Sequence, residues 1–115
     1  MIDPNYTMSN IEHLACDAAN AINALQGRKT TSVEELYTTI GNVAQRRALA
    51  QNFALYVLKT YFGFSYPVLA QRSGYDEKAV MKCVKRVQEC LRMNDILYIQ
   101  MEQEVRTRLT KEYGE

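Results

Sequence analysis

The chain has 115 residues, of which 47% are apolar and 23% are charged, and its formal net charge is +1. This length fits one domain with its own hydrophobic core, and the composition excludes collagen-like, mucin-like and intrinsically disordered proteins. With five Gly, two Pro and no Trp, the chain has few of the turn residues that a many-stranded β domain requires, so we expect an all-α fold.

The N-terminal part of the sequence predicts two helices. Ser9 or Asn10 is a suitable N-cap for a first helix that ends before Gly27. Ser32 is followed three residues later by a glutamate, the spacing of a capping box, which predicts a short second helix that ends near Gly41. The buried stripe predicted for the first helix consists of apolar residues at helical spacing: Ile11, Leu14, Ala15, Ala18, Ile22 and Leu25.

Two more helices are predicted in the middle of the chain. Asn42 can cap a long core helix that ends at Gly63. Ser65 can cap a short helix with Pro67 in its first turn, where the missing N–H of proline has no cost, and this helix must end at Gly74. The predicted stripe of the long helix is Leu49, Phe53, Tyr56, Val57 and Tyr61.

The last two predicted helices begin after Asp76 and after the Asn94-Asp95 pair. Together the signals predict a compact bundle of about six helices in a single domain, with 1–41 as N-terminal helices and 42–112 as the core. The predicted inward residues of the fifth helix are Val80, Cys83, Val84, Val87 and Leu91, and those of the sixth are Ile96, Ile99, Val105 and Leu109.

Positive charge is concentrated in one part of the chain. Residues 1–58 carry four basic and five acidic side chains, residues 59–92 carry seven and three, and residues 93–115 carry three and five. The middle window therefore has a net charge of +4. Such a window is where the electrostatic footprint for a polyanion such as nucleic acid is expected.

The same window contains the pattern of a helix-turn-helix unit. It reads PVLAQRSGYDEKAVMKCVKRV over 67–87, with Ala70, Gly74 and Val80 at relative positions 5, 9 and 15. A small residue lets two helices cross closely, glycine permits the left-handed turn, and the β-branched residue locks the second helix onto the first. A helix held in this way can enter a DNA major groove about 12 Å wide.

The segment from Arg46 to Leu109 resembles the C-terminal DNA-binding domain of DnaA, the bacterial chromosomal replication initiator, which has a TrpR-like helix-turn-helix fold. The matching stretches are ALYVLKTYFG, FSYP, the turn at Gly74 and Asp76, and VMKCVKRVQECL. The resemblance implies binding of double-stranded DNA in replication initiation. By the same resemblance, Gln45, Arg46 and Arg47 would contact the DNA backbone, Tyr66 and Pro67 the groove wall, and Lys78, Ala79 and Lys82 base edges or phosphate.

Further DNA contacts are expected from the residues themselves. Tyr75 lies in the turn, Lys85 and Arg86 lie on the second helix of the unit, and Glu77 can accept from a cytosine amino group. The base-reading stretch Asp-His-Thr-Thr of the family is Asp-Glu-Lys-Ala here, so the family's DNA sequence preference is not carried over. No GxxxxGK[ST] loop occurs in the sequence, so the chain lacks the initiator's ATPase motif.

Two alternatives to this function remain open. The same unit also looks like the promoter-reading helix-turn-helix of sigma factors, which points to transcription regulation. The acidic pair Asp76-Glu77 and the near-neutral total charge are consistent with a protein-interaction module that retains the bundle without reading DNA.

The remaining signals argue against other classes of protein. No nucleophile motif or paired catalytic carboxylates occur, so we expect no catalysis and no catalytic residues. The three cysteines show no CxxC spacing and His13 is the single histidine, so neither a metal site nor a cofactor is expected. No apolar run of about 18 residues is present, and we expect a cytoplasmic protein without a membrane partner. The C-terminal amphipathic helix is an alternative site for a homodimer.

Overall fold

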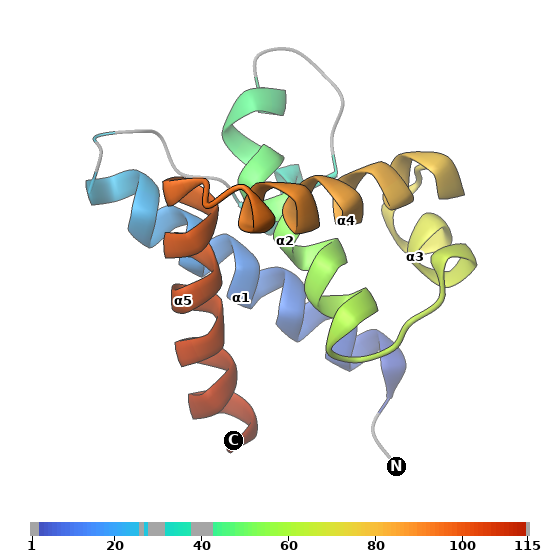
Figure 1. Cartoon of the computed structure of the whole chain (residues 1–115). Helices are drawn as coiled ribbons and strands as arrows, with labels where there is room; N and C mark the ends of the chain where they lie inside the picture. Colours follow the sequence, from blue (N-terminus) through green and yellow to red (C-terminus); the bar gives the residue numbers. More distant parts are fainter. Residues whose placement is uncertain (1–2, 26, 28–31, 38–42, 115) are drawn as a thin grey trace.

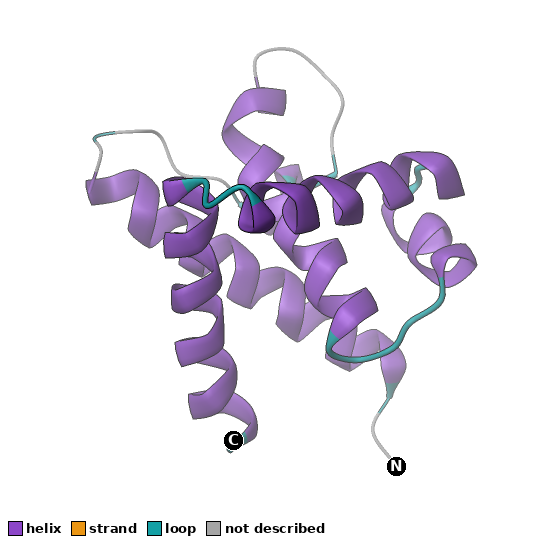
Figure 2. Cartoon of the chain, viewed as in Figure 1, coloured by secondary structure: helices purple, strands orange, loops and turns teal. Residues whose placement is uncertain are grey.

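The computed structural model describes residues 3–25, 27, 32–37 and 43–114, and of these the side chains of 43–47 are outside the description. Every regular element in these ranges is a helix (Figure 1, Figure 2). They are α1 Pro4–Leu25, η1 Val33–Glu35, α2 Val43–Thr60, α3 Tyr66–Ser73, α4 Glu77–Arg92 and α5 Ile96–Tyr113. The Cα radius of gyration, 13.2 Å, is close to the value of about 13 Å for a compact domain of this length. The predicted all-α fold is confirmed.

α2 is the central helix of the bundle. α1 and α4 both pack on it, α1 also packs on α5, and α3 packs mainly on α4. Figure 1 shows α4 crossing α2, with α3 beside the N-terminal end of α4 and α5 leading away from its C-terminal end. Residues 49–55, 57 and 58 are all buried, so α2 is covered on nearly all sides, as expected for a core helix.

α1 is longer than the sequence pattern predicts. It begins at Pro4 instead of Ser9 or Asn10, because Asp3 caps it: the Asp3 carboxylate accepts from the N–H of Asn5 at 2.9 Å, and proline fits the first turn. The predicted stripe is buried except for Leu25, which is 89% exposed. The end of α1 extends beyond the packed core, so the prediction for Leu25 is wrong.

The predicted second helix is a single 3₁₀ turn among the described residues, which hold five α-helices where about six helices were expected. The predicted capping box between Ser32 and Glu35 is present, and the Glu35 carboxylate accepts from the N–H of Ser32 at 3.5 Å. This short turn is enough to place Leu36 in the core with no exposed surface. The predicted end near Gly41 lies outside the described residues.

α5 buries part of the predicted stripe: Val105 is buried and Leu109 is half-buried against the core, but Ile96 is not covered. Tyr98, Met101 and Val105 face the core, whereas Ile96 is 73% exposed. Asp95 caps the helix by accepting from two N–H groups of its first turn. Ile96 stands at the first position of the helix, before α5 meets the bundle, which explains why the prediction for this residue is wrong.

Burial of the cysteines gives a first testable prediction. Burial, followed by the negative charge of Asp17, raises the pKa of the Cys16 thiol to about 12. Since the thiolate is the reactive form, we expect iodoacetamide at pH 8 to modify half-buried Cys83 well before Cys16 in the native protein. Mass spectrometry of timed samples measures the rate at which each cysteine is modified. Denaturant is expected to remove the difference between the two rates. Equal native rates would contradict the burial of Cys16.

The same pKa shift predicts lower stability in alkaline solution. The folded state holds the Cys16 proton more tightly than the unfolded state, so its contribution is complete below about pH 9 and decreases as the pH rises toward about 12.

Candidate nucleic-acid interface

α3 and α4 are joined by a sharp turn that local capping contacts define. Ser65 accepts from a backbone N–H in the first turn of α3 at 3.4 Å, and Asp76 does the same for α4 at 2.8 Å. Gly74 has a left-handed φ of 80°, and its N–H donates to the carbonyl of Ala70 at 2.9 Å. A side chain is strained at this φ, so glycine allows the chain to leave α3 and begin α4 within three residues.

The α3–α4 pair rests on a continuous apolar seam. Leu69 of α3 and Val80 and Val84 of α4 are buried, and Ala70 is half-buried beside them. These are the positions that the sequence pattern requires to be apolar or small. One side of each helix therefore packs on the core, and the opposite side of α4 faces outward.

One exposed face of α4 is basic over its first three turns. Lys78, Lys82 and Lys85 are all exposed and recur at the i, i+4, i+7 spacing of one helix face. None of the ion pairs found among the described residues involves these lysines. Glu89 follows on the same face, so the basic part ends there. We call Lys78, Lys82 and Lys85 the lysine face.

The other predicted contact residues of α3 and α4 differ in their exposure. Glu77 and Pro67 are exposed, and Tyr66 and Ala79 are half-buried. The ammonium group of Lys59, on α2, lies 4.6 Å from the centre of the Tyr66 ring, a cation–π contact. This contact brings a further positive charge to the start of α3, and the sequence pattern did not single out Lys59.

Tyr75 differs from the other predicted contacts because its side chain is engaged internally. Its hydroxyl lies 2.7 Å from the Gln51 side-chain oxygen and 3.0 Å from the carbonyl of Tyr37. Its ring also meets the ring of Tyr37 edge to face, with centroids 6.1 Å apart. Tyr75 therefore anchors the turn to α2 and to the segment after η1, and it is not part of the exposed lysine face.

Four further residues are predicted to contact DNA: Gln45, Arg46, Arg47 and Arg86. The side chains of Gln45, Arg46 and Arg47 lie outside the described residues. Arg86 is exposed on α4, and a hydrogen bond with the hydroxyl of Tyr98 raises its pKa. This contact directs Arg86 toward α5.

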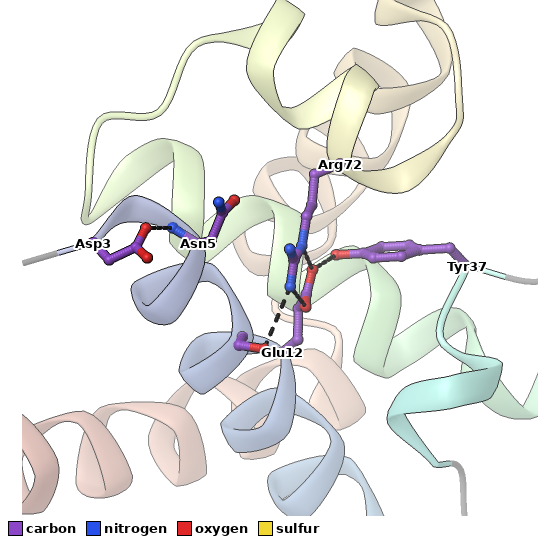
Figure 3. Close-up of polar contacts among 6 residues, drawn as sticks. Asp3, Asn5, Glu12, Tyr37 and Arg72 are labelled. Carbon is purple, nitrogen blue, oxygen red and sulfur yellow. Dashed lines mark hydrogen bonds and ion pairs between the residues drawn. The ribbon is translucent and has the colours of Figure 1, made fainter.

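A buried ion pair connects α3 to α1, and sequence reasoning did not find it. Glu12 of α1 is 3% exposed, and Arg72 of α3 donates to both of its carboxylate oxygens, at 3.0 and 2.8 Å. The Tyr37 hydroxyl donates to the same carboxylate at 2.8 Å, and Arg72 also reaches Ser9 at 3.4 Å. Figure 3 shows Arg72 and Tyr37 converging on Glu12 from two different segments.

Within this cluster the positive charge of Arg72 neutralises the negative charge of Glu12. The hydrogen bonds to Glu12 raise the pKa of Arg72, and burial together with the Glu12 charge raises the pKa of Tyr37 well above its ordinary value. A two-point guanidinium–carboxylate contact is strong and directional. The cluster therefore fixes the orientation of α3 relative to α1, and the only sequence signal for it is a glutamate one helical turn before the predicted buried Ala15.

Comparisons of the chain with protein-family models, with curated proteins and with solved structures find no match. In the described part of the chain no helix has the length and apolar character needed to cross a membrane. No group of three or more His, Cys, Asp or Glu side chains in that part is placed to hold a metal ion.

Proposed function

We propose that the chain binds double-stranded DNA through α3 and α4, acting as a helix-turn-helix in the control of replication initiation or of transcription, without catalysis. The observation that carries this proposal is the lysine face, which stands on a helix held to its neighbour by a left-handed glycine turn. A helix about 10–12 Å across fits a major groove about 12 Å wide. In that position Lys78, Lys82 and Lys85 meet phosphates and base edges.

Two features at the ends of the helices support the same orientation. The first turn of α3 carries the positive end of the helix dipole, and Lys59 lies beside it. This end suits a DNA phosphate at the groove wall. Glu77, at the start of α4, matches a cytosine amino group in the groove.

Salt dependence tests the proposal, because neutralised phosphates release counterions. If Lys59, Lys78, Lys82 and Lys85 each neutralise one phosphate, raising the salt from about 50 mM to about 200 mM is expected to raise Kd about 100-fold. Fluorescence anisotropy with a labelled pool of random 30-base-pair duplexes measures this change. Single-stranded DNA of the same length, expected to bind more weakly, is the comparison. No binding to duplex at the lower salt would contradict DNA binding.

A protein-interaction module is the second candidate function. The exposed carboxylates of Glu77 and Glu89, on the same helix as the lysine face, are the observation that favours it. A mixed surface of this kind suits a partner protein with complementary charges better than a uniformly negative polymer. Absence of duplex binding at low salt, in a protein that remains folded by circular dichroism, would favour this candidate.

A further inference from the structure

One apolar side chain interrupts the polar outer surface at the start of α4. Met81 is 47% exposed, while Val80, Val84 and Val87 of the same helix are buried. On a helix surface the neighbours of a residue are three and four positions away. For Met81 the outward neighbours are Glu77, Lys78 and Lys85, so the thioether lies among the charged groups of the proposed interface.

The major groove offers one apolar group that such a side chain can contact. The base edges there present hydrogen-bond donors and acceptors, and the C5-methyl group of thymine is their single hydrocarbon feature. A lysine gains little from a methyl group, whereas methionine is flexible, polarisable and apolar. Met81 is thus suited to distinguish thymine from the other bases.

The helix geometry also places this contact relative to Glu77. Four residues of helix span about 6 Å along the axis, and base pairs are spaced by about 3.4 Å. When α4 follows the groove, Met81 meets a base pair about two steps from the one that Glu77 faces.

We propose that Met81 contacts the methyl group of a thymine in the major groove and gives the protein a preference for thymine at one position of its DNA site. This inference rests on the proposed DNA binding and deepens it, because it assigns a sequence preference to one residue. Burial of a single methyl group favours thymine over uracil about fourfold in affinity.

The experiment compares two random duplex pools that differ only in this methyl group. One is synthesised with thymidine and the other with deoxyuridine, and the bound fraction of each is sequenced. We expect the wild-type protein to enrich thymine at one position of the first pool and to show no matching preference for uracil in the second. Met81→Gln, which keeps the length and flexibility of the side chain, is expected to lose the thymine preference at that position in the first pool and to show none for uracil in the second.

Met93→Gln is the matched control, because Met93 is 78% exposed but caps the far end of α4. It is expected to behave as the wild type in both pools. A preference that is equally strong for thymine and uracil, or that survives in Met81→Gln, overturns the role of Met81. Absence of binding to both pools overturns the proposed function itself, so the two failures are distinguishable.

Discussion

Replacing Arg72 by methionine is expected to lower the free energy of unfolding by about 3 kcal/mol, because it leaves the carboxylate of Glu12 buried without a countercharge. Removal of one partner of a buried ion pair costs about 3–5 kcal/mol. The lower value applies here, since 27% of the Arg72 side chain is exposed. Urea denaturation followed by circular dichroism measures the loss, which corresponds to a fall of about 10 °C or more in Tm.

Two further variants separate charge burial from a general packing defect. Arg108→Met removes an arginine from its pair with Glu104, in which both side chains are about one third exposed, and is expected to cost under about 1 kcal/mol. Adding Glu12→Gln to Arg72→Met removes the buried charge and keeps an acceptor for the Tyr37 hydroxyl, so the double variant is expected to be more stable than Arg72→Met alone. A double variant that is less stable than Arg72→Met would contradict this explanation.

The second large effect is expected in DNA binding. Lys78→Ala and Lys82→Ala each remove an exposed charge from the lysine face, and we expect each to raise Kd about tenfold and to reduce the salt slope by about one. Combining the two is expected to weaken binding about 100-fold if the sites act independently. Anisotropy titrations of the same duplex pool at several salt concentrations measure both quantities.

The control for these variants lies on another helix. Lys111→Ala removes one exposed charge from α5, away from α3 and α4, and is expected to leave Kd within about twofold of the wild type. All of these surface substitutions are expected to change stability by no more than about 0.5 kcal/mol. Equal losses of affinity in Lys78→Ala and Lys111→Ala would indicate nonspecific attraction instead of a groove-bound α4.

The buried pair gives α1 a role that its sequence does not reveal. Arg72 belongs to the first helix of the proposed helix-turn-helix and Glu12 to α1, so the N-terminal helix helps to set the angle at which α3 is held. The lysine face depends in turn on α3, because α4 packs on it through Leu69 and Val80. Stability of the N-terminal region and DNA affinity are therefore expected to be coupled.

The sequence by itself determined the helical class and most helix ends. Ser65, Asp76 and Asp95 were recognised as caps, and Gly74 as the left-handed turn, because capping and backbone sterics involve only a few neighbouring residues. The outward position of Lys78, Lys82 and Lys85 also followed from the helical period alone. Each of these features is decided within about one turn of helix.

Only the tertiary structure decided which surfaces meet. Glu12 carries no local sign that Arg72, 60 positions away, will neutralise it. Tyr75 and Ile96 fit their local patterns, yet the first is engaged by α2 and the second is left uncovered, because exposure depends on which element packs alongside. Packing between distant segments depends on many weak contacts with other elements. The residue pattern of a single helix does not specify those contacts.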